Sequence, residues 1–265
     1  MFNPEVVSKN SHESLELSRE EIREKMNDPT YLPTREQIIS AYDTSIEDTV
    51  AWGNYFFNNE RPVYELLTEE YVDALADFFL QKLSEYGNST ENPLTILEVG
   101  SGDGRLSHFL QKKLDEKAPG EVIVIASDSG QWNLETTFPV EKMEHTQALE
   151  SRNPDIVVSS WMPYQTDLTA DFRSNQSLKG YVLIGAPDVT GDFDKTWGNA
   201  EFCNSPGVEK DEDYVPEYQS DSFIATELEG LSQMQICRLD THLSDEENSW
   251  ASHHSITAYF ERQTS

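Results

Sequence analysis

The sequence has little positive charge, few cysteines and no long apolar run. Its 265 residues include 19 Lys and Arg against 49 Asp and Glu, a formal net charge of -30 at pH 7. A protein that holds nucleic acid by its phosphates needs a basic surface, so this composition argues against a nucleic-acid partner. Anionic lipid headgroups would be repelled for the same reason, which argues against a membrane partner. Strong acidity is also typical of adaptation to high salt, and the sequence leaves that interpretation open.

The remaining absences concern metal sites, membrane spans and export. Cys203 and Cys237 stand far apart and lack the spacing of a metal site, so we expect two reduced thiols and no bound metal. No apolar run approaches the ~20 residues of a membrane-spanning helix. The first residues lack the basic and apolar parts of a secretory signal. Together these absences predict a cytoplasmic protein.

The first third of the chain has helical patterns and no strand pattern. We expect residues 1–17 to form a flexible acidic segment, because no periodicity is present there. Capping signals at Ser18 and Thr34 begin two short helices, and an amphipathic pattern over 68–87 predicts a longer one. Residues 18–92 are therefore predicted to form a helical N-terminal cap.

From residue 93 onward, short apolar runs alternate with helical segments. The expected strands are 95–99, 122–126, 140–143, 156–160, 181–185, 234–239 and 255–260. Continuously apolar strands are typical of a parallel sheet that helices cover on both faces. Residues 93–265 are therefore predicted to be a doubly wound, Rossmann-like α/β domain. Segment 188–221, with ten acidic and two basic residues, is expected to be an insertion on the substrate side.

The most informative segment is 98–104, EVGSGDG, in which a buried strand leads into a glycine turn and then a helix. Glycines without a Cβ atom allow a ligand to contact the main chain. A dinucleotide turn has the spacing G-x-G-x-x-G, and its third glycine would fall on Arg105 here. The carboxylates of Glu98 and Asp103 would oppose a pyrophosphate and suit a cationic ligand.

The pattern E-x-G-x-G-x-G in this segment resembles the first motif of class I S-adenosylmethionine-dependent methyltransferases. In that family an acidic residue after the second strand binds the ribose hydroxyls, and Asp128 matches that position. The resemblance covers roughly residues 94–262. It implies bound S-adenosylmethionine, a seven-stranded mixed sheet whose last strand is antiparallel, and a lid formed by helices before the first strand.

The resemblance also implies a cofactor site at the carboxyl ends of the first four strands. Its expected residues are Glu98, Gly100, Ser101, Gly102, Asp103, Gly104, Asp128, Ser129, Glu144, Ser160 and Trp161. For the contact with the adenine after the third strand, His145 and Gln147 are candidates beside Glu144. Residues 160–164, SWMPY, share Pro-Tyr with the Asn/Asp-Pro-Pro-Tyr motif of some amine-methylating members but lack its amide. Methylation of a nucleobase or a glutamine amide is therefore not expected.

Methyl transfer from a sulfonium requires the nucleophile, the methyl carbon and the sulfur to be in line, and a protonated nucleophile also requires a base. Candidates for that base are Tyr164, Asp188 and His145, near the strand ends where ligands of open α/β sheets bind. The acidic and aromatic segment 188–221 would suit a cationic acceptor, and a solvated loop is the alternative.

These observations predict a methyltransferase that acts on a small molecule or a protein side chain. One alternative is a non-catalytic binding or regulatory subunit that keeps the fold and its cofactor pocket. A third interpretation is an aminopropyl-transferring enzyme, which uses a related cofactor on a similar sheet. The sequence does not define the oligomeric state.

Overall fold

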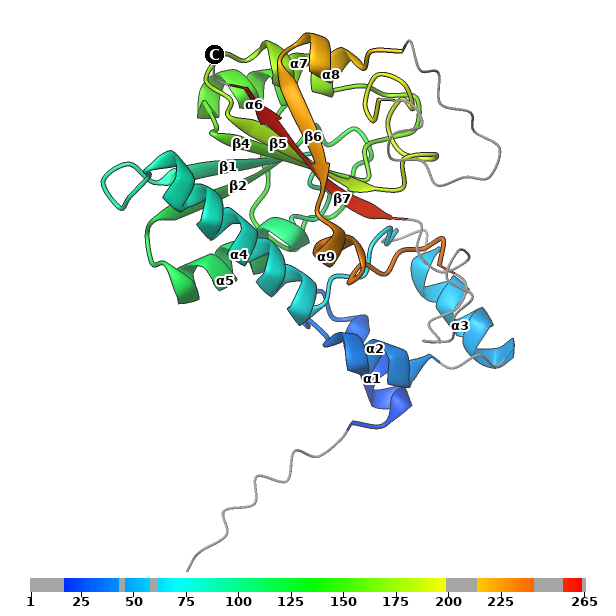
Figure 1. Cartoon of the computed structure of the whole chain (residues 1–265). Coiled ribbons are helices and arrows are strands. Elements are labelled where there is room, and N and C mark those ends of the chain that lie inside the picture. Colours follow the sequence, from blue (N-terminus) through cyan, green and yellow to red (C-terminus); the bar gives the residue numbers. More distant parts are fainter. Residues whose placement is uncertain (1–16, 43–45, 58–61, 199–213, 241–254, 264–265) are drawn as a thin grey trace, which may run out of the picture.

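The structure is a computed structural model of the whole chain, and it describes residues 17–42, 46–57, 62–198, 214–240 and 255–263 (Figure 1). The N-terminal segment that we predicted to be flexible lies outside these residues, except for its last position. Among the described residues, no helix has both the length and the apolar character needed to cross a bilayer.

A seven-stranded sheet forms the centre of the molecule, in the order β3-β2-β1-β4-β5-β7-β6. The strands are β1 (Leu94–Val99), β2 (Val122–Asp128), β3 (Glu141–Lys142), β4 (Ile156–Ser160), β5 (Gly180–Gly185), β6 (Phe223–Glu227) and β7 (Ile256–Arg262). Strands β1 to β5 are parallel, and β7 is antiparallel to both β5 and β6. This topology confirms the predicted Rossmann-like fold with an antiparallel last strand.

Helices cover both faces of the sheet (Figure 1). They are α1 (Arg19–Met26), α2 (Arg35–Ala41), α3 (Ile46–Phe56), α4 (Glu69–Tyr86), α5 (Arg105–Lys117), α6 (His145–Arg152), α7 (Thr169–Ser174), α8 (Glu217–Ser220) and α9 (Glu229–Ser232). Apolar side chains of α4 and α5 share one core cluster with Ile96 of β1. Those of α6 and α7 share a second cluster with Leu97, the next residue of β1. Side chains along β1 therefore alternate between two buried layers.

The helix ends follow the capping signals of the sequence. Ser18 and Thr34 each form a capping box with the residue three positions later, which begins α1 and α2. The Thr68 hydroxyl accepts the backbone N–H of Tyr71 at the start of α4. That helix ends at Gly87, whose φ of 69° lies in the left-handed region that glycine adopts at low cost.

The prediction of a strand over 234–239 was wrong, because the sixth strand is β6 (Phe223–Glu227). Residues 234–239 pair instead with the segment before α4: the Leu66 N–H donates to the Ile236 carbonyl and the Arg238 N–H to the Tyr64 carbonyl. Ile236 is buried in the cluster formed by the N-terminal helices. The apolar residues that suggested a sheet strand are therefore buried against helices. At the other edge, β3 is shorter than the predicted 140–143.

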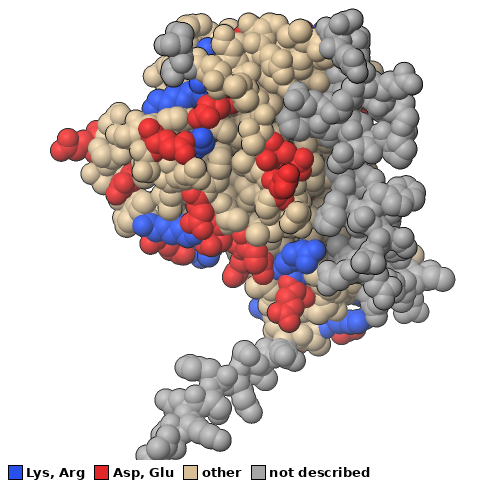
Figure 2. Space-filling view, viewed as in Figure 1, with Lys and Arg blue, Asp and Glu red and all other residues tan. Residues whose placement is uncertain are grey.

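Helices α1 to α3 form a third cluster of their own, whereas α4 packs against the sheet. Helices α1 to α3 lie beyond the carboxyl end of the parallel strands (Figure 1). This is the end of the sheet at which β7 begins. On the face with α4 and α5, acidic and basic side chains are interspersed (Figure 2), as where Lys117 pairs with Asp73 and Asp77. The division into a cap over 18–92 and a domain over 93–265 stays a prediction.

Candidate functional site

The glycine turn joins β1 to α5 at the carboxyl end of the sheet. Gly100, Gly102 and Gly104 have φ of 68°, 57° and 77°, in the left-handed region that favours glycine. A Cβ atom on Gly100 would meet no other atom within 4 Å, so main chain faces open space there. A Cβ on Gly104 would lie 2.7 Å from Val140 Cγ2. Gly100 therefore leaves room for a ligand, and Gly104 is required by packing.

Replacing Gly104 by alanine should lower the free energy of unfolding by about 2–3 kcal/mol, because the left-handed conformation and the contact with Val140 both oppose a Cβ atom. Gly87→Ala is the matched control, since Gly87 also has a positive φ but a Cβ atom there would meet nothing within 4 Å. Urea denaturation of both variants measures the difference. An equal decrease in the free energy of unfolding for the two variants would show that Val140 moves aside at no cost.

Asp128 connects the glycine turn to the end of β2. Its Oδ2 accepts the Gly102 N–H at 3.1 Å and its Oδ1 accepts the Gly130 N–H at 2.7 Å. Each carboxylate oxygen has two lone-pair sites, so both oxygens retain capacity for one more donor. The side chain thus fixes the turn and can still accept the hydroxyl groups of a ligand. Ser129, the next residue, accepts the Gln131 N–H within the following loop.

Glu98 lies below the turn and is only 3% exposed. Its Oε2 accepts both the N–H and the hydroxyl of Ser107 in the first turn of α5, at 3.1 and 2.5 Å. Burial raises the pKa of the Glu98 carboxyl to about 7; hydrogen bonds from Ser107 oppose the rise, and the nearby Asp103 and Asp128 carboxylates add to it. Glu98 therefore holds the start of α5 against β1.

The turn has the features expected of a site for S-adenosylmethionine. Main chain is accessible at Gly100, and Asp128 retains acceptor capacity beside it. The Ser101 hydroxyl is buried and has no hydrogen-bond partner among the described residues, so a polar ligand atom would satisfy it. The surrounding carboxylates favour a ligand that carries positive charge. These residues therefore fit S-adenosylmethionine, the cofactor that the sequence implied.

The remaining predicted cofactor residues lie at the end of β4 and at the start of α6. Ser160 ends β4 and is followed by Trp161, and β4 is paired with β1. Glu144 lies at the N-cap position of α6, where its exposed side chain makes no capping hydrogen bond. The structure therefore brings Ser160 and Trp161 to the edge that carries the glycine turn, and leaves Glu144 in solvent.

The three predicted catalytic side chains lie on separate segments, which follow β3, β4 and β5. Tyr164 is 65% exposed, and Asp188 is exposed in the turn after β5. His145 begins α6, and its Nε2 lies 2.7 Å from Asp171 Oδ2 of α7. No described contact joins any two of them. Their assignment as catalytic groups stays a prediction.

Sequence reasoning missed Glu65, which contacts the end of β4 from the N-terminal side. Its Oε2 accepts the indole N–H of Trp161 at 2.9 Å, and its Oε1 accepts the Ser255 hydroxyl at 3.2 Å. Trp161 has a φ of 54°, an uncommon conformation for a bulky residue and one that is typical of functional sites. Glu65 thus holds the side chain of a residue with an uncommon backbone conformation at the carboxyl end of the sheet.

The Glu65 carboxyl is enclosed although part of the residue is exposed. Burial raises its pKa to about 8; the hydrogen bond from Trp161 opposes the rise, and the neighbouring Asp240 carboxylate adds to it. The group is therefore mostly protonated at neutral pH. No local pattern in the sequence could have indicated this, since a single carboxylate between two helices has no periodic signature.

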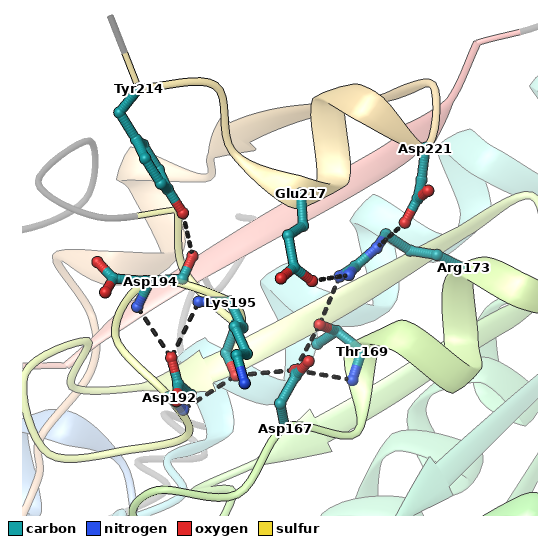
Figure 3. A network of polar contacts seen from close by, with 10 residues as sticks. Asp167, Thr169, Arg173, Asp192, Asp194, Lys195, Tyr214, Glu217 and Asp221 are labelled. Atoms are coloured by element: carbon teal, nitrogen blue, oxygen red, sulfur yellow. Dashed lines mark hydrogen bonds and ion pairs between the residues drawn. The ribbon is translucent and has the colours of Figure 1, made fainter. Parts of the chain in front are cut away.

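Five of the ten acidic residues in segment 188–221 lie in the described part of the chain. Figure 3 labels Asp192, Asp194, Glu217 and Asp221 among them. Arg173 of α7, with a side chain 1% exposed, donates to Asp221 at 2.6 Å and to Glu217 at 3.0 Å. Asp192 accepts the backbone N–H groups of Asp194 and Lys195. These carboxylates hold α8 and the loop after β5 in place. The other five lie outside the described residues, so a role in binding cations stays a prediction.

No protein-family model matches the sequence, and no curated protein matches it. Among solved structures, it is similar to the N-terminal domain of human METTL16, at 10% identity over 100% of both chains with a TM-score of 0.44. It is also similar to DszA carbon methyltransferase, at 13% identity with a TM-score of 0.42. The match covers 86% of this chain and 63% of the length of DszA, which is less than two thirds of that protein. M. capricolum TrmK in complex with S-adenosyl-homocysteine gives 11% identity and a TM-score of 0.34, over 71% and 69%. At these identities the likeness concerns the fold alone.

Proposed function

We propose that this chain, which has the class I methyltransferase fold, binds S-adenosylmethionine and transfers its methyl group to a small molecule or a protein side chain. The observation that carries the proposal is the acidic glycine turn whose Gly102 N–H is held by Asp128 at the ends of β1 and β2. Gly100 leaves main chain accessible beside this carboxylate.

The residues of the turn would hold the cofactor by charge and by hydrogen bonds. Asp128 would accept ribose hydroxyls with its remaining lone pairs, and the Ser101 hydroxyl would gain a polar partner. When bound, S-adenosylmethionine supplies a methyl group activated by a positively charged sulfur. Because the methyl group is already activated, the protein's main contribution is to orient the acceptor. The hydrogen bond from Trp161 to Glu65 fixes this side chain at the end of β4, which supports a role for it in orienting the acceptor.

One observation favours a second candidate, a binding or regulatory subunit with the same fold but no activity. No described contact joins any two of Tyr164, Asp188 and His145, and His145 Nε2 lies beside Asp171 instead. Such a subunit would bind S-adenosylmethionine without forming a methylated product. Incubation with radiolabelled S-adenosylmethionine and candidate acceptors separates the two functions, because only the enzyme releases S-adenosylhomocysteine.

S-adenosylmethionine should raise the melting temperature of the protein, because it binds only the folded state. At about 100 times its Kd a ligand adds about 2.7 kcal/mol to the free energy of unfolding. For a domain of this size, that corresponds to a rise of about 5–10 °C. Differential scanning calorimetry and calorimetric titration measure the two quantities. NADH is the control ligand: a response to NADH alone would indicate a dinucleotide site, and a response to neither would contradict the proposal.

A further inference from the structure

Arg238 contacts two aromatic rings at the carboxyl end of the sheet. Its guanidinium carbon is 4.2 Å from the centre of the Phe57 ring and 4.5 Å from that of Tyr64. The Tyr64 ring also contacts Trp161, with ring centres 5.5 Å apart at an angle of 32°. Phe57 and Tyr64 are 59% and 44% exposed. We call Phe57, Arg238, Tyr64 and Trp161 the aromatic–arginine stack.

The guanidinium of Arg238 has no acceptor or carboxylate partner among the residues that the structure describes. Arg152 and Arg173 pair with carboxylates, and Arg262 donates to backbone carbonyls. In contrast, the one hydrogen bond that Arg238 donates to a described residue is from its backbone N–H to the Tyr64 carbonyl. The guanidinium carbon lies over both the Phe57 ring and the Tyr64 ring. A planar guanidinium with free edges is suited to bind an oxyanion through two parallel hydrogen bonds.

The nearby carboxyl groups leave this positive charge available. The Asp240 carboxylate accepts the Cys237 backbone N–H at 2.7 Å, and Glu65 is directed to Trp161 and Ser255. Burial raises the pKa of Glu65 to about 8, so this carboxyl is mostly uncharged at neutral pH. In a chain with a net charge of -30, a locally unpaired arginine is a place where an anion can approach.

We infer that Arg238 binds a carboxylate or phosphate group of the methyl acceptor, with the aromatic–arginine stack forming one wall of the acceptor site. The stack extends from the end of α3 to the residue after β4, on the edge of the sheet that carries the glycine turn. This inference rests on the proposed function for its view of the ligand as an acceptor. The acceptor inferred here is anionic, whereas the acidic segment 188–221 suggested a cationic one. Binding of a cationic probe is therefore one outcome of the test.

The test uses the full chain labelled with 5-fluorotryptophan, with the Trp161 signal identified from Trp161→Phe. The probes are benzoate, phenyl phosphate, neutral benzamide and cationic benzylamine, titrated while the fluorine spectrum is recorded. We expect saturable shifts of the Trp161 signal with one or both anions and none with benzamide or benzylamine. Comparing benzoate with phenyl phosphate shows which of the two anionic groups the site prefers.

Arg238→Met should weaken binding of the preferred anion by about tenfold or more, since it removes charged hydrogen bonds. Arg238→Lys keeps the charge without the planar fork and should give an intermediate Kd. The control is Lys112→Met, which removes one exposed positive charge from α5. Equal binding of benzamide, binding of benzylamine, an unchanged Kd in Arg238→Met, or no shift with any probe would overturn the inference.

Titration with S-adenosylmethionine on the same sample separates the two proposals. If S-adenosylmethionine binds and the anions do not, the inference about Arg238 fails while the proposed function stands. If the anions bind through Arg238 and S-adenosylmethionine does not, the anion site stands and its assignment to a methyl acceptor fails with the proposed function.

Discussion

Glu65→Gln should make the protein more stable than the wild type at about pH 8 and leave its stability near pH 4 almost unchanged. The amide introduced by this substitution would keep an oxygen for the Trp161 indole N–H, and its nitrogen could donate to the Ser255 hydroxyl. The substitution therefore preserves the hydrogen bonds of the site and removes only the group that ionises.

The direction follows from the raised pKa of Glu65. The carboxyl has a pKa of about 8 in the folded chain against an ordinary value of 4.5. Between these values the unfolded chain has lost its proton and the folded chain has not, so wild-type stability falls as the pH rises. The whole pKa difference between the folded and the unfolded chain corresponds to on the order of 5 kcal/mol in the free energy of unfolding. The raised pKa of Glu98 also makes wild-type stability fall with pH, up to about pH 7. Glu65→Gln therefore removes only part of the dependence of stability on pH.

Urea denaturation at a series of pH values measures this effect. The same change at Glu229, which is exposed on α9, should leave the wild-type pH profile intact. Parallel profiles for the wild type and Glu65→Gln would show that Glu65 ionises normally and that its enclosure by Trp161 and Ser255 does not persist in solution.

Asp128→Ala should weaken binding of S-adenosylmethionine by about a hundredfold, the upper range for losing a charged hydrogen-bonded contact. Two losses combine at this position. The ribose loses its acceptor, and the Gly102 and Gly130 N–H groups lose the carboxylate that orders the turn. Asp128→Asn keeps one acceptor oxygen and should fall between the wild type and the alanine variant.

Calorimetric titration gives the affinities, and circular dichroism checks that each variant is folded. The control is Glu150→Ala on α6, which removes an exposed carboxylate away from the turn and should leave the Kd unchanged. An affinity that is unchanged in Asp128→Ala would place the cofactor elsewhere. Similar losses in Asp128→Ala and Glu150→Ala would show that bulk acidity, and no specific carboxylate, governs binding.

Local sequence signals identified the fold and the glycine turn. Apolar runs alternating with helical segments predicted a parallel sheet covered on two faces, and β1 to β5 have that arrangement. The capping residues Ser18 and Thr34 predicted where helices begin, because a cap acts within one helical turn. The step from β1 through three glycines into α5 is equally local. These features depend on neighbours in the chain, so the sequence alone determined them.

Contacts between distant parts of the chain were decided only by the tertiary structure. Trp161 and Glu65 are 96 positions apart, and the Glu65 pKa rises because packing encloses the carboxyl. Residues 234–239 have a strand-like pattern, yet Ile236 is buried against helices while Phe223–Glu227 pairs with β7. Apolar periodicity shows that a segment has a buried side but not which partner covers it, and that partner depends on the path of the whole chain.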